Sequence, residues 1–332
     1  MLCIIFHNLK PVSLALTFEV DVREELDVRR PARFCSNFSQ LWKRTSHTFI
    51  AAMSAVAQSG LILIALHVYG GRRSGALSLY DLHHALPRLK IEGIATALAS
   101  LQKLYICVAP YVPEDNTEEE NAPQDNTEGG SPNNEYYMAL AEIISLTPNI
   151  EELDVHGFKV RGQRDIYLDS IIQKALHKLK KCALRGAYIE EDSLLQLLRN
   201  NLQLESLYLK HIVLSGGSWK NIFNYLALTS SSDSAATHET DSCSTTSCEL
   251  DVVILDSLSA SPPGRYLRFL QRDGKKPPIY APQWRIEIHG TAHLRYEIQY
   301  DVPSEQWSKE SSESIVEFGP LAYAPSDDIF GV

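Results

Sequence analysis

A short apolar pattern recurs along this chain and constrains its fold more than any other feature. The pattern is L-x-x-L-x-L, with other apolar residues allowed, and it occurs six times. The copies begin at Leu63, Leu101, Ile150, Leu179, Leu204 and Leu250. Three successive copies start 29 residues (150 to 179) and 25 residues (179 to 204) apart, within the roughly 20–29-residue period of leucine-rich repeats. An apolar extension, x-x-Φ-x-Φ, follows most copies and fails only in the first, at Gly71 and Arg73.

This repeat predicts an α/β solenoid. The two apolar residues of L-x-L point to one side of a strand, and no single unit buries that side alone. Apolar residues at helical spacing in 135–145, 165–176, 192–202 and 219–228 predict the intervening helices. We therefore expect an irregular leucine-rich-repeat solenoid of the ribonuclease-inhibitor type, with a parallel concave sheet and convex helices. The usual repeat asparagine is missing, so regularity stays open, and an ordinary α/β domain with leucine-rich strands is the alternative.

The predicted organisation has three parts. Residues 1–60 form an N-terminal flank or cap, with a strand at 13–20 and a helix at 37–58. Residues 61–262 form the solenoid, with polar inserts at 112–134 and 230–247 that we expect to be disordered. Residues 263–332 form a C-terminal cap and loose tail. In this cap we expect a short helix at 266–271 and an antiparallel β-hairpin of 284–289 and 293–302 around Gly290-Thr291.

Composition excludes several classes of protein. The formal net charge of -10 and the lack of a basic stripe argue against nucleic-acid binding. The six cysteines are scattered, and Cys107 and Cys182 sit in apolar runs, so we expect free thiols in a reducing, cytoplasmic or nuclear compartment. The uncharged stretch 49–68 has the length of a membrane span, but Gln58-Ser59-Gly60 interrupts it. A helix to Ala57 and a strand from Leu61 fit better, so a membrane-anchored repeat protein is only a minor alternative.

The motifs of catalysis and cofactor binding are absent from the sequence. Residues 70–77 have half of a P-loop spacing but lack its Lys-Ser/Thr pair. His83 and His84 are adjacent and diverge on a helix, which argues against a shared metal. We therefore expect no enzyme activity, no cofactor and no metal.

The repeat also predicts a binding surface. Side chains between the inward leucines point to the concave face, and their mixture of charge, tyrosine and arginine is typical of a protein-binding strip; a merely solvated face is the alternative. The strip comprises His67, Tyr69, Lys103, Tyr105, Glu152, Asp154, His156, Lys181, Arg185, Tyr208, Lys210 and Asp256. We expect a protein partner of unknown identity, and we expect Tyr208 and Arg185 to be replaceable by alanine without unfolding the chain.

Two neighbouring segments carry a family resemblance. Residues 200–209 (NNLQLESLYL) and 213–226 (VLSGGSWKNIFNYL) together resemble the fungal F-box/leucine-rich-repeat-like proteins, with one extra glycine before Ser218. The resemblance covers roughly residues 60 to 300. It implies that the repeats choose substrates for a cullin-type ubiquitin ligase, with an F-box docking to the Skp adaptor. No F-box opening is visible in residues 1–60, so adaptor binding requires an F-box upstream of Met1.

Overall fold

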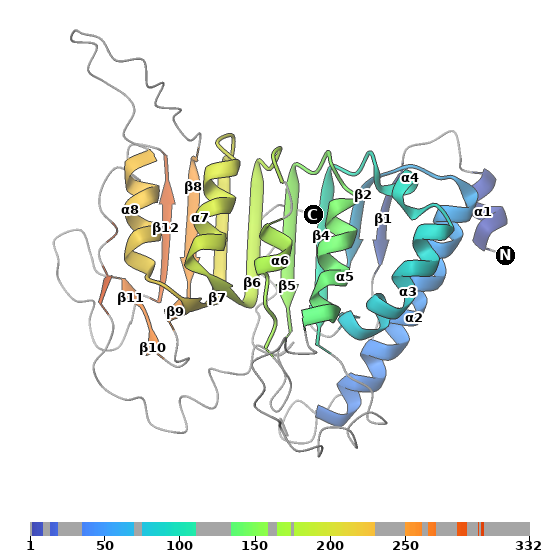
Figure 1. Cartoon of the computed structure of the whole chain (residues 1–332), viewed down its shortest axis with the longest axis horizontal. Helices are drawn as coiled ribbons and strands as arrows, with labels where there is room; N and C mark the ends of the chain where they lie inside the picture. The colour runs from blue at the N-terminus through green and yellow to red at the C-terminus, as the bar shows by residue number, and fades with distance from the viewer. Residues whose placement is uncertain are drawn as a thin grey trace, which may run out of the picture. The chain divides into compact units, whose positions relative to one another are not determined.

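The described part of the chain has an α/β fold with a mostly parallel open sheet (Figure 1). The computed structural model describes residues 2–8, 14–18, 35–69, 75–110, 134–158, 165–173, 176–229, 250–260, 265–269, 284–290, 298 and 300–301. Its contacts divide the chain into two compact units. The first holds the described residues up to Ile150 and those of 155–173, and the second holds Glu151–Asp154 and the described residues from 176 onward.

The first unit alternates helices and strands, and its strands β1, β2 and β4 pair in parallel. Leu66 lies beside Leu104 and Val68 beside Ile106, so corresponding positions of two repeat copies are neighbours. The elements are α1 (Leu2–Asn8), β1 (Leu14–Phe18), α2 (Cys35–Ser59), β2 (Leu63–Val68), β3 (Leu77–Ser78), α3 (Leu79–Ile91), α4 (Ile94–Leu98), β4 (Lys103–Ala109), α5 (Asn134–Ser145), the end of β5 (Glu152–Gly157) and α6 (Asp169–Ile172).

The extension that fails in the first repeat copy is supplied from further along the chain. β3 pairs in parallel with the end of β4, where Leu77 lies beside Val108. Two buried side chains of α2 fix the position of the backbone at and just before β3. The Thr45 hydroxyl donates to the Ala76 carbonyl over 2.6 Å, and the Ser78 N–H donates to the Ser46 hydroxyl over 2.8 Å. These two buried polar side chains thus satisfy backbone groups of the irregular first repeat.

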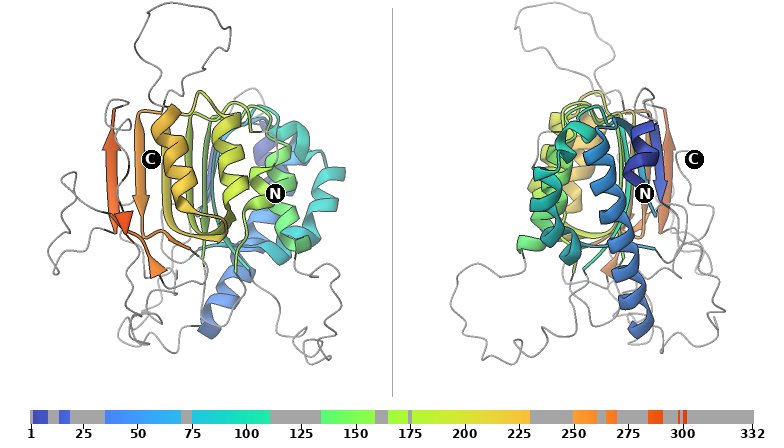
Figure 2. Two further views of the ribbon diagram at one scale, coloured as in Figure 1. Left: turned by 60° about the vertical axis from the view of Figure 1, so that its left-hand side comes forward. Right: turned by 90° about the vertical axis from the view of Figure 1, so that its right-hand side faces the viewer.

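The second unit has the most regular repetition. β6, β7 and β8 pair in parallel, and equivalent repeat positions are cross-strand partners: Leu184, Leu209 and Leu255 form one row, and all three are 0% exposed. α7 and α8 lie on one face of these strands (Figures 1 and 2). The elements are β6 (Lys181–Glu190), α7 (Glu191–Asn200), β7 (Ser206–Gly216), α8 (Trp219–Thr229), β8 (Val252–Asp256), β9 (Ser259–Ala260), β10 (Arg265–Tyr266), β11 (Arg268–Phe269), β12 (Arg285–His289) and β13 (Tyr300–Asp301).

Each of these three parallel strands turns at the same repeat position. Gly186, His211 and Ser257 have φ values of 63°, 51° and 53°, and each follows directly after the aligned residues Arg185, Lys210 and Asp256. The left-handed conformation costs a residue with a Cβ roughly 1–2 kcal/mol. Its recurrence in register therefore indicates that pairing on both sides of the bend fixes the backbone there, even where glycine is absent.

In the Gly-Gly-Ser-Trp segment before α8, only the second glycine, Gly217, is required by the structure. Gly217 has φ +85°, and a Cβ there would collide with the Glu191 side chain, whereas a Cβ on Gly216 would meet nothing within 4 Å. Glu191 needs this close approach because its carboxylate accepts hydrogen bonds from the Ser218 N–H (2.5 Å) and the Asn221 amide (2.7 Å). The carboxylate therefore holds the residue before α8 and a side chain of its first turn, and it lies beside the positive end of the helix.

Several expected elements are confirmed, and others are corrected. The helices predicted at 37–58, 135–145, 192–202 and 219–228 match α2, α5, α7 and α8, and the strand at 13–20 matches β1. The helix predicted at 165–176 is only the four residues of α6. The insert 230–247 lies outside the described residues, as does 112–134 except for Asn134, which begins α5.

The described residues do not form the predicted C-terminal hairpin. β12 forms within the expected segment and is antiparallel, but its partner is β8, where Ile286 lies beside Leu255. Within the second expected strand, Tyr300–Asp301 pair instead with β11 in a separate two-stranded sheet. The helix expected at 266–271 is also wrong, because β10 and β11 occupy its described residues. Within the described residues, no helix combines the length and apolar character needed to cross a bilayer.

Alanine substitutions at the two adjacent glycines test whether Gly217, but not Gly216, is required. We expect Gly217→Ala to lower the free energy of unfolding by roughly 2 kcal/mol or more, because left-handed strain adds to a steric collision. Gly216→Ala serves as the matched control and is expected to change it by less than about 1 kcal/mol. Urea unfolding of both variants checks this, and equal losses would contradict the close approach of Glu191.

Candidate functional site

The second unit presents one polar face, on the side of β6, β7, β8 and β12 away from the buried leucines. Side chains alternate between the two faces of a strand, so the residues flanking each leucine point to this side. We call this surface the charged face. It comprises Glu152, Asp154, Lys181, Arg185, Tyr208, Lys210, Asp256, Arg285, Glu287 and His289.

Strand register arranges the charged face in rows. One row runs through Arg185, Lys210, Asp256 and Arg285, which are successive cross-strand partners. The next contains Tyr208 and Glu287 on either side of Ile254. Directly opposite residues of a sheet lie close enough to interact. The same register that aligns the leucines on one side therefore aligns basic and acidic groups on the other.

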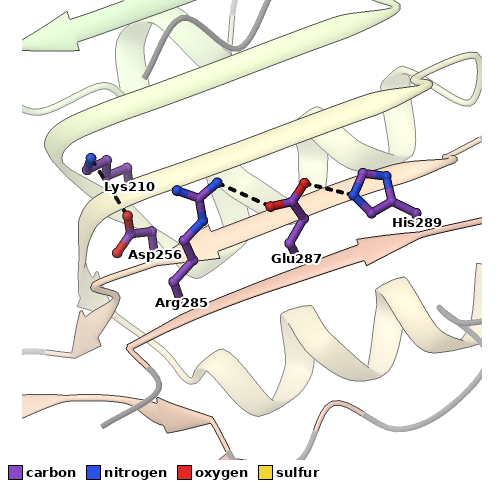
Figure 3. A network of polar contacts seen from close by, with 5 residues as sticks. All are labelled: Lys210, Asp256, Arg285, Glu287 and His289. Carbon is purple, nitrogen blue, oxygen red and sulfur yellow. Dashed lines mark hydrogen bonds and ion pairs between the residues drawn. The ribbon is translucent and has the colours of Figure 1, made fainter. Parts of the chain in front are cut away.

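The middle of the charged face is buried and internally paired. Arg185 and Asp154 form an ion pair whose side chains are 10% and 9% exposed, and the Arg185 guanidinium lies 5.4 Å from the centre of the Tyr208 ring. Lys210 pairs with Asp256 across 3.7 Å (Figure 3). A buried charge is tolerated only when it is paired and hydrogen-bonded, and pairing within this part of the face meets that requirement.

Exposure increases at both margins of the charged face. At one margin, the Lys181 ammonium lies 3.3 Å from Glu152, with side chains 34% and 13% exposed. At the other, Glu287 contacts both Arg285 (3.2 Å) and His289 (2.7 Å), as Figure 3 shows. The hydrogen bond from His289, aided by Arg285, holds the pKa of the Glu287 carboxyl below its usual value. Glu287 is therefore an anion between two potential cations at neutral pH.

The first unit places its members of the predicted strip differently. His67 and Tyr105 are cross-strand partners whose ring centres lie 4.4 Å apart, and Lys103 on the same strand as Tyr105 is exposed. His156 is buried, with Nδ1 3.7 Å from the Cys107 sulfur. Tyr69 leaves the strip, because its φ of 61° turns the side chain toward α2, where its hydroxyl donates to the Thr45 carbonyl over 2.7 Å.

Burial divides the twelve predicted strip residues. Lys103 is exposed, and His67, Glu152, Lys181 and Asp256 are partly exposed. The other seven are buried: Tyr69, Tyr105, Asp154, His156, Arg185, Tyr208 and Lys210. The expectation that Tyr208 and Arg185 can be replaced without unfolding is inconsistent with their exposures of 1% and 8%. Conversely, the sequence analysis missed three residues of the charged face: Arg285, Glu287 and His289. Their alternation with apolar residues predicted a strand, but the sequence did not show that this strand pairs with β8.

Metal ligands and cysteine thiols are the reactive groups to consider among the described residues. They contain no group of three or more His, Cys, Asp or Glu side chains able to hold a metal ion. Cys107 and Cys182 are free and buried, as expected from their apolar surroundings. Burial raises the pKa of the Cys182 thiol to about 12, so this sulfur stays protonated and is a poor nucleophile.

No protein-family model matches the chain, and a search of the curated proteins finds no significant match. The resemblance to fungal F-box/leucine-rich-repeat-like proteins therefore stays a prediction from the sequence.

The buried ion pair yields a stability test. We expect Arg185→Ala to lower the free energy of unfolding by roughly 3–5 kcal/mol, because it leaves the Asp154 carboxylate buried without its cation. Lys180→Ala is the matched control: Lys180 pairs with Glu151 at 2.8 Å, but both side chains are well exposed. Chemical denaturation measures both variants, and a minor effect of Arg185→Ala would show that the pair does not stabilise the sheet.

Proposed function

We propose that this chain is a non-enzymatic leucine-rich-repeat module that binds another protein through the charged face. The observation that carries the proposal is the alignment of equivalent repeat positions in the second unit. Cys182, Leu207 and Val253, the fourth residues of three copies, are successive cross-strand partners. In a repeat array each unit contacts only its neighbours in this way, and the stacked units present an extended surface for binding.

The composition of the charged face supports a protein partner over other ligands. Its margins combine both signs of charge, among them the partly exposed Lys181 and the exposed Arg285 and Glu287. Interfaces between proteins have polar rims of this kind, and complementary charges there give specificity and faster association. A single-sign basic surface, which nucleic acid requires, is absent from the described part of this face.

The buried pairs define how the face is used. Arg185, Tyr208 and Lys210 hold the strands in fixed positions, while the partly exposed side chains beside them contact the partner. Because the supporting groups are already paired, little reorganisation accompanies binding, which lowers the entropic cost of association. This division of roles places recognition at the margins rather than along the whole strip predicted from the sequence.

A charge reversal at one margin tests the proposal. We expect Lys181→Glu to reduce recovery of specific partners in affinity purification about tenfold, because the new carboxylate repels groups that the lysine attracts. Lys220→Glu, the same change at an exposed position near the start of α8, is the matched control. Quantitative mass spectrometry compares the captured proteins, and circular dichroism verifies that both variants fold. Identical partner profiles for the wild type and both variants would contradict binding through the charged face.

A further inference from the structure

The strand β12 ends the strand order of the second unit and presents an edge away from β8. Among the described strands, β12 is hydrogen-bonded only to β8. The Trp284 carbonyl accepts from the Ser257 N–H, and the Gly290 N–H donates to the Asp251 carbonyl. In an antiparallel ladder, alternate residues direct both backbone groups to the same neighbour. The backbone groups of Arg285, Glu287 and His289 therefore face the opposite edge.

The side chains of β12 differ from those of the neighbouring strands. Arg285, Glu287 and His289 are exposed on the charged face, and Ile286 and Ile288 are only partly buried on the other. Their cross-strand partners on β8, Leu255 and Val253, are both 0% exposed. An edge with available backbone groups and partly exposed apolar residues is a template for pairing with another strand. Further burial of both isoleucines would favour such pairing.

The order of charges on β12 identifies the strand that fits this edge. Two copies of β12 can pair antiparallel about a two-fold axis at Ile286, Glu287 or Ile288. The Glu287 register is repulsive, since it places two glutamates opposite each other and each arginine opposite a histidine. The Ile288 register places each Glu287 opposite His289, which is charged only when protonated. The Ile286 register instead places each Glu287 opposite Arg285 of the second copy, which gives two full ion pairs. The sequence Arg-x-Glu is thus its own complement when reversed, which is what a two-fold, self-complementary interface requires.

We propose that β12 is a self-association edge, and that its occupant is β12 of a second copy of this chain, antiparallel and centred on Ile286. The two pairs of Arg285 and Glu287 select this register, and the two Ile286 side chains meet on the opposite face. A single short strand buries little area, so the dimer is weak and forms with rising protein concentration. This assembly does not depend on the protein-binding function proposed above.

Reciprocal charge reversals test the dimer on the full chain. Sedimentation velocity at low ionic strength, over a hundredfold range of concentration, should show the wild type passing from monomer to dimer. Arg285→Glu alone and Glu287→Arg alone should each remain monomeric at the highest concentration, because like charges then face each other across the two-fold axis. An equimolar mixture of these two variants should form a heterodimer, since each all-acidic strand then meets an all-basic one.

The mixture separates pairing between copies from damage within one chain. In the mixture each variant still carries like charges at positions 285 and 287 of its own strand, so only contact between copies can restore association. Melting curves establish that each variant is folded. Three results would each overturn the proposal: a wild type that is monomeric throughout, single variants that dimerise as well as the wild type, or a mixture that stays monomeric.

Discussion

The structure depends on the in-register burial of leucines between neighbouring parallel strands. Leu184, Leu209 and Leu255 each lie beside the next and are fully buried, and burying one such side chain contributes about 1.5–3 kcal/mol. Because side chains alternate along a strand, a slip of one residue would exchange the buried and polar faces. The leucine rows therefore fix the register, and every feature of the opposite face follows from it.

The same register buries charged side chains on the opposite face, and these side chains need partners. Arg185, Lys210 and Asp256 are brought side by side by the strands, and two of these three are less than a tenth exposed. Charges at such depth destabilise a fold unless each has a partner, which Asp154 and Asp256 provide. The left-handed residues that follow, His211 and Ser257, accept backbone strain at the same level of the sheet. Stability and recognition thus occupy adjacent parts of one surface.

The sequence predicted those helices and strands whose apolar residues recur at a regular local spacing. Helical spacing marked α5, α7 and α8, and the repeat marked β4, β6, β7 and β8. α3 was missed because Pro87 lies inside it, and proline inside an apolar pattern normally argues against a helix. The partner of β12 was missed because a hairpin with a neighbouring segment is the local solution, whereas β8 is distant in the sequence. The burial of Arg185 and Tyr208 was missed because it depends on cross-strand pairs that no single strand reveals.

The register between β6 and β7 is the most direct test of this account. Lys181 and Ser206 are cross-strand partners, and both are partly exposed. Replacing both with cysteine should give a disulfide under mild oxidation, detectable by peptide mass mapping, because opposite residues in paired strands lie within bonding distance. The pair Lys181→Cys with Lys210→Cys, displaced along the strand, should give none. A bridge in the displaced pair, or none in the aligned pair, would contradict the leucine register on which the fold and the charged face depend.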